Sequence, residues 1–209
     1  MAELLLDVQS VPATPAGGTA MVYVDTVSKR LTVKDDAGYI KGNIQNYSTV
    51  AQAPAAATRT YIAGSALTIP TGKIQVGTKF RWRFNITKTA AGTAASTYDV
   101  AVGTAGTTAD TARVSFTKPA GTAAVDAGWI EIIVICLGPL GVNGVFVGEF
   151  SLIHNLSATG HAAIPCVCVN TISAGFDVTV ANLIVGVCIT SGAADAITIQ
   201  MVDAEAVNV

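Results

Sequence analysis

Apolar and polar residues alternate with a period of two along most of this chain. The clearest run is Lys79–Lys88, in which Phe80, Trp82, Phe84 and Ile86 occupy alternate positions and basic or polar residues occupy the others. Successive side chains of a β-strand point to opposite faces of the sheet. The run therefore predicts a strand with an aromatic core face and a polar second face.

Further strand-like runs follow at intervals of about ten to twenty residues, with turn residues between them and no helical period. They cover 98–102, 112–116, 129–137, 145–153, 164–169, 177–180, 183–190 and 196–202. Recurrent short strands of this kind are typical of two-sheet folds. We expect an all-β fold, a jelly-roll-like antiparallel β-sandwich over 61–209.

Two of these runs, 132–135 and 184–187, are apolar at successive positions. A strand in a two-layer sandwich buries one face, so apolar residues on both faces indicate that the second face is also covered. Neighbouring copies of the chain are the simplest cover. The candidate subunit-interface residues are Ile133, Ile135, Ile184 and Cys188.

The first sixty residues differ from the rest and divide into three parts. Residues 1–19 contain two prolines and predict an extended arm, 20–42 predict a small β-meander, and the polar and alanine-rich 43–60 predict a linker. Arm and meander are too small to be stable alone, so we expect them to anchor the chain on a partner. The candidate anchoring residues are Leu4, Leu5, Leu6, Val22, Tyr23, Val24, Leu31 and Val33.

The composition of the chain excludes two classes of partner. Hydrophobic residues make up 51% of the chain and charged residues 12%, and the formal net charge is -2. The most apolar stretch, 130–150, holds two glutamates, a proline and several glycines, which a membrane-spanning helix would exclude. A nucleic-acid-binding protein would need a basic surface. We therefore predict neither a membrane nor a nucleic-acid partner.

Candidate chemistry is sparse. The chain has two histidines and four cysteines, and it lacks nucleophile-elbow, P-loop, zinc-protease and dinucleotide-binding motifs. Cys166 and Cys168 lie two residues apart, with His154 and His161 upstream, but this spacing is poor for a metal site. Because the first residues lack an export signal, we expect free thiols that fill core positions. No enzyme activity, metal or cofactor is predicted.

The N-terminal half also carries a resemblance to a known group of proteins. The prolines and glycines of 12–18, the segments 22–25, 29–31 and 34–38, and the later segments 60–70, 77–84 and 87–93 resemble tailed-bacteriophage virion proteins. These are head decoration (cement) proteins, head fibres and tail-fibre subunits. The resemblance implies a homotrimer with an N-terminal anchor and an outward-facing sandwich, and it implies no catalytic residue.

These observations lead to an expected function with alternatives. We expect a capsid decoration protein of a phage virion, assembled in the host cytoplasm, whose partners are other copies of the chain and the major capsid protein or another virion protein. A tail or head fibre that binds a host-surface glycan is the first alternative. A polysaccharide depolymerase and a cytokine-like trimer are more distant alternatives.

Overall fold

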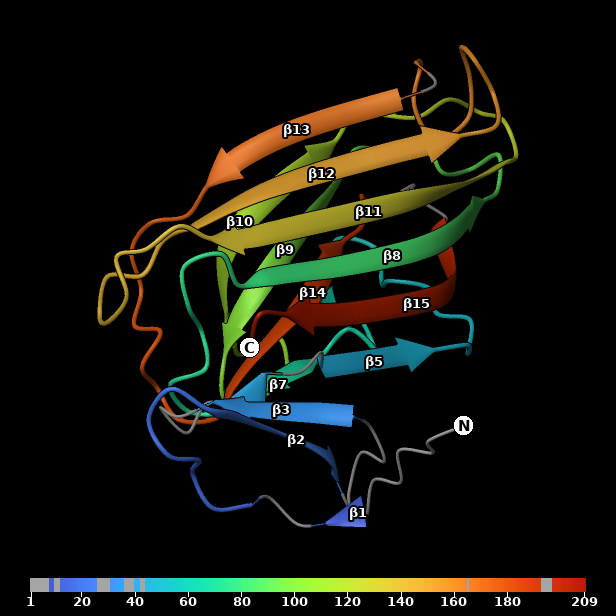
Figure 1. Cartoon of the computed structure of the whole chain (residues 1–209). Helices are drawn as coiled ribbons and strands as arrows, with labels where there is room; N and C mark the ends of the chain where they lie inside the picture. The colour runs from blue at the N-terminus through green and yellow to red at the C-terminus, as the bar shows by residue number, and fades with distance from the viewer. Residues whose placement is uncertain are drawn as a thin grey trace, which may run out of the picture.

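Fifteen strands and no helix form the part of the chain that the computed structural model describes, residues 8–9, 12–25, 31–35, 40–41, 44–164, 166–192 and 197–209. The strands belong to three sheets (Figure 1). Over these ranges, no helix is long and apolar enough to cross a membrane. The predicted all-β class is confirmed.

The largest sheet contains six strands, each antiparallel to its neighbours. In their order across the sheet they are β13 (Cys166–Ile172), β12 (Phe146–His154), β11 (Asp126–Cys136), β8 (Lys79–Lys88), β15 (Ile197–Val207) and β5 (Ile44–Ser48). The strand with the clearest alternation, β8, lies inside the sheet between β11 and β15. Its central place follows from its aromatic face, which needs packing partners along its whole length.

A second antiparallel sheet packs against the first. Its order is β10 (Thr111–Lys118), β9 (Ser96–Gly103), β14 (Leu183–Thr190) and β6 (Arg59–Tyr61), and β7 (Leu67–Ile69) pairs with the other end of β14. The sandwich prediction is therefore confirmed, whereas the finer jelly-roll connectivity stays a prediction.

The core between the two sheets is built from the inward positions of the alternating strands. Phe80, Trp82 and Phe84 have no exposed surface. From the opposite sheet Tyr98 packs on Phe150, with ring centroids 5.1 Å apart. The aromatic side chains thus fill the space between the layers, which lie about 10 Å apart in sandwiches of this kind.

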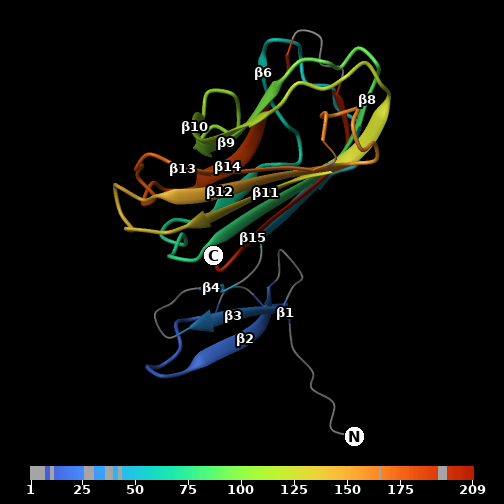
Figure 2. The same cartoon turned by 90° about the horizontal axis from the view of Figure 1, so that it is seen from above.

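The third sheet is small and consists of β1 (Val8–Gln9), β2 (Ala20–Asp25), β3 (Leu31–Asp35) and β4 (Ile40–Lys41). The last three form an antiparallel meander, as expected for 20–42, and β1 from the predicted arm pairs parallel to β2. Within the described ranges its strands contact none of the sandwich strands. Figure 2 shows the small sheet lying beside the sandwich as a separate module.

Two segments differ from the sequence prediction. Ile44–Ser48, assigned to a linker, is the edge strand β5, which pairs with β15 and alternates between half-buried and exposed positions. The polar sequence of this segment did not indicate a strand, because an edge strand needs few apolar residues. The predicted strand at 177–180 is instead irregular, since the Asp177 carboxylate accepts hydrogen bonds from the backbone N–H and the hydroxyl of Thr179.

Replacement of Trp82 by alanine tests the importance of the aromatic core. The indole is fully buried and its Nε1–H donates to the Ser65 carbonyl over 2.7 Å. Trp82→Ala leaves a large cavity and an unpaired carbonyl, so the free energy of unfolding in urea should fall by about 3–5 kcal/mol. Tyr47→Ala removes a side chain that is 72% exposed on the same sheet, and an equal loss there would contradict this account.

Candidate functional site

One face of the small sheet presents the predicted anchoring valines. Val22 lies opposite Val33 in the pairing of β2 and β3, and Val24 lies opposite Leu31. Directly opposed residues share a face, so these positions lie together on one side. Val22 is 47% exposed, and Val24 and Val33 are half-buried. Val22, Val24 and Val33 form a small apolar surface, called here the valine face.

The other face of the small sheet is closed by the chain itself. Tyr23 is 1% exposed and Lys34 is buried, and the Lys34 Nζ donates to the Pro12 carbonyl of the arm over 2.6 Å. Tyr23, predicted to touch a partner, is therefore a core residue of the module, because its alternate position in β2 points away from the valine face. Leu4, Leu5 and Leu6 lie outside the described residues.

The outer face of the six-stranded sheet carries the first two predicted interface residues. Ile133 and Ile135 of β11 lie half-buried on this face. Val147 lies opposite Ile135, and Ile172 lies opposite Val147 at the edge, where it is 65% exposed. One end of this face is therefore an apolar row that runs across three strands.

Charged residues cross the middle of the same face and are paired within the chain. The Arg81 guanidinium lies 3.0 Å from Glu205, 3.8 Å from Asp203 and 4.0 Å from Glu131. The neighbouring Arg83 stacks on Trp129, 4.8 Å from the ring centroid, and Trp129 is half-buried rather than in the core. The basic face predicted for β8 thus occurs, but carboxylates and an indole engage its arginines.

The other two predicted interface residues lie on β14, and its outer face is largely covered by the chain itself. Ile184 is half-buried, but Cys188 is fully buried. Tyr61 covers the strand so closely that a Cβ added at Gly186 would lie 1.9 Å from the tyrosine oxygen. Arg59 lies beside it and donates to the Asp99 carboxylate and to two carbonyls of the loop 104–110. Cys188 offers no surface to a neighbouring copy, so its assignment to an interface is wrong.

The cysteines fit the expectation of buried thiols only in part. Cys136 and Cys188 are buried and free, and burial raises the pKa of the Cys188 thiol to about 12. Cys168, by contrast, is exposed on β13, with its Sγ 3.3 Å from the Ser151 hydroxyl. Among the described residues, no three His, Cys, Asp or Glu side chains gather closely enough to hold a metal ion.

A cluster of charged side chains that the sequence prediction missed closes one end of the sandwich. Lys88, Lys118 and His154 end β8, β10 and β12, and Asp126 begins β11. All four are buried because they occupy inward positions of their strands. The sequence did contain a signal for a buried charge, since the alternation that places Phe84 and Ile86 inward also places Lys88 inward.

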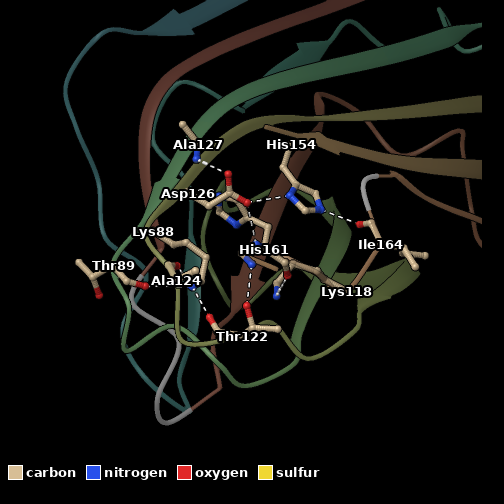
Figure 3. A network of polar contacts seen from close by, with 11 residues as sticks. Lys88, Thr89, Lys118, Thr122, Ala124, Asp126, Ala127, His154, His161 and Ile164 are labelled. Atoms are coloured by element: carbon tan, nitrogen blue, oxygen red, sulfur yellow. Dashed lines mark hydrogen bonds and ion pairs between the residues drawn. The ribbon is translucent and has the colours of Figure 1, made fainter. Parts of the chain in front are cut away.

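Asp126 is the centre of this cluster (Figure 3). Its carboxylate accepts hydrogen bonds from the backbone N–H groups of Ala127, over 2.8 Å, and His161, over 2.9 Å, and it lies 2.7 Å from the Nδ1 of His154. Burial raises its pKa, but the two N–H groups and His154 outweigh this effect and lower the pKa overall. Asp126 is therefore ionised at neutral pH.

The ring of His154 lies between two oxygen acceptors. Its Nε2 is 2.6 Å from the Ile164 carbonyl, and its Nδ1 faces the Asp126 carboxylate without the alignment of a linear hydrogen bond. A neutral imidazole carries hydrogen on only one nitrogen, so one of these contacts would then join two lone pairs. The geometry fits an imidazolium that forms a buried ion pair with Asp126.

The two lysines bind backbone carbonyls at the same end. Lys118 Nζ donates to the carbonyls of Pro119 and His161, over 3.0 and 3.1 Å. Lys88 Nζ donates to the carbonyls of Thr89, Thr122 and Ala124. The cluster thus joins strand ends to the loops that follow them.

Asp126→Asn tests the buried ion pair. The substitution keeps the shape of the side chain but removes the charge that His154 faces, and loss of one partner of a buried pair costs about 3–5 kcal/mol. The free energy of unfolding at pH 7 should fall by that order. Asp177→Asn is the matched control on an exposed turn, and an equal loss in both variants would contradict the assignment.

Comparisons with known proteins found no match. No protein-family model, curated protein or solved structure matches the chain. The β-sandwich therefore stands on the strands described above, and the resemblance to phage virion proteins stays a prediction.

Proposed function

We propose that this chain is a structural protein of a tailed-bacteriophage virion, a capsid decoration protein that binds the outer head surface as a trimer and stabilises the head. The observation that carries the proposal is the valine face. It belongs to a module whose strands touch no sandwich strand in the described ranges, and the described contact of the arm, from Lys34 to Pro12, lies on the opposite side of that module. A small sheet with one open apolar face needs a partner surface.

The energetics favour attachment through several copies. Complete burial of a valine side chain contributes about 1.5–3 kcal/mol, so one valine face gives weak binding once the cost of association is subtracted. Three linked copies would raise the overall affinity by orders of magnitude through effective concentration. A trimer is therefore the form in which so small an anchor is useful.

The apolar row on the six-stranded sheet supports self-association. Ile133, Ile135, Val147 and Ile172 adjoin one another across three strands, and Ile172 at the edge is 65% exposed. Contiguous apolar surface of this kind marks interaction sites in proteins. We assign this row to contacts between copies of the chain.

One observation favours the alternative of a fibre subunit that binds the host. The loop between β11 and β12 contains Leu137, Leu140 and Val142, which are 49%, 50% and 65% exposed. It is held in place, since Val178 and Gly144 donate to the carbonyls of Gly141 and Phe176. A rigid apolar loop fits a receptor contact, and immunogold labelling of purified particles separates the two roles by locating the chain on the head or on the tail.

The double substitution Val22→Asp and Val33→Asp tests the anchor. Both residues lie on the valine face, so two carboxylates there should prevent burial against the shell. Particles stripped of the chain should rebind the wild type and not the variant in a sedimentation assay, with apparent affinity reduced at least 100-fold.

The matched control is Val125→Asp, which changes a residue that is 73% exposed on the sandwich. This variant should rebind as the wild type does. Full rebinding of the double variant would show that the small sheet is not the anchor.

Ile135→Asp tests the assigned contact between copies. A carboxylate in the centre of the apolar row should lower the fraction of trimer in analytical ultracentrifugation, whereas Val125→Asp should leave it unchanged. A trimer that persists in Ile135→Asp would place the subunit contact elsewhere on the molecule.

A further inference from the structure

His161 is the one imidazole among the described residues in which neither ring nitrogen makes a hydrogen bond. Its side chain is fully buried, and Nδ1 and Nε2 both lack hydrogen-bond partners among the described residues. A buried neutral imidazole in such a place tolerates its missing bonds, but a buried imidazolium with two unbonded N–H groups would be costly. This ring therefore stays neutral while the sandwich end is closed.

The surroundings of the ring also oppose a second positive charge. The charged groups that face it are Lys88 from β8, Lys118 from β10, Asp126 from β11 and His154 from β12, whose ring centroid lies 6.0 Å away. Asp126 favours protonation, and the other three disfavour it. The carboxylate is already engaged by His154 and by two backbone N–H groups.

His161 belongs to the loop 155–164. Residues 160–164 of this loop are held mainly by hydrogen bonds to the cluster and to Thr122. The backbone N–H of His161 donates to Asp126, and its carbonyl accepts from Lys118. Gly160 exchanges hydrogen bonds with Thr122, and the Ile164 carbonyl contacts His154. A change of charge at His161 acts directly on these contacts.

Gly160 shows how closely the loop fits against the cluster. Its φ is +96°, and a Cβ built there would lie 1.9 Å from the Asp126 carboxylate oxygen. The carboxylate thus rests directly against the bare backbone of the loop, so the position of the loop depends on the position of Asp126.

We propose that the cluster at this end of the sandwich is an acid-sensitive latch, in which protonation of His161 releases the loop 155–164 from strands β8, β10, β11 and β12. In the released loop the His161 ring reaches water, where its proton is solvated. Acid shifts the balance toward that form because only the open form binds the proton readily.

The direction of the pH dependence follows from linkage. Burial, more than the neighbouring charges, lowers the pKa of His161 from its ordinary 6.5 to about 4. The stability that the closed loop gains is fully present above pH 6.5 and is lost as the pH falls from 6.5 toward 4. The opening constant should rise about 20-fold between pH 7 and pH 5.

Hydrogen exchange of the full chain tests the latch. Protection factors of the amides in 155–164 should fall about 20-fold from pH 7 to pH 5, while amides in the middle of β8 keep theirs. His161→Phe keeps a buried ring of similar size without a titrating group, and its loop protection should not change over this range. Ser157→Ala, an exposed change in the same loop, should keep the wild-type dependence.

An NMR titration of the His161 ring in the wild-type protein provides a readout that needs no variant. A ring pKa far below 6.5 together with the loss of loop protection supports the latch. A ring that titrates near 6.5, or loop protection that stays constant from pH 7 to pH 5, would overturn it. A pH dependence in His161→Phe equal to that of the wild type would also overturn it.

Discussion

The inward face of β8 is the constraint on which the sandwich depends. Phe80, Trp82 and Phe84 project from the middle of the six-stranded sheet and are fully buried. Their size sets the space between the two sheets. Tyr98 and Phe116 of the second sheet fill part of this space by packing on Phe150 of the six-stranded sheet. Since adjacent strands are locked in register with β8, its alternation also fixes which residues of β11 and β15 face outward.

The same constraint explains the charged cluster at the end of the sandwich. Strands that alternate strictly carry their inward positions to the last residue, so Lys88, Lys118, Asp126 and His154 enter the layer between the sheets where apolar packing ends. Buried charges need partners, and here the carbonyls and N–H groups of the connecting loops supply them. These bonds also fix the positions of the loops, so in our proposal the conformation of the loop 155–164 depends on the protonation of His161.

The apolar residues that make the chain so hydrophobic lie mainly in three places. Many lie in the core, and others lie on the valine face and on the apolar row of the six-stranded sheet. Arg81 and its carboxylates are satisfied within one face. A chain with 12% charged residues therefore presents few unpaired charges there, which suits a protein whose proposed role is contact with other protein surfaces.

The sequence by itself determined the strands with strict alternation and the meander, because these follow from the local period of two. It did not reveal the edge strand β5, whose polar residues become a strand only through pairing with β15. It also assigned Cys188 and Tyr23 to contact surfaces, whereas Tyr61 covers the outer face of β14 beside Cys188. Tyr23 alternates with Val22 and Val24 in β2 and is 1% exposed. The alternation already placed Lys88 inward, but only the tertiary structure brought Asp126, His154 and His161 together, because the cluster joins the ends of separate strands and loops. Local patterns fix which face a side chain takes, and long-range packing decides what covers that face.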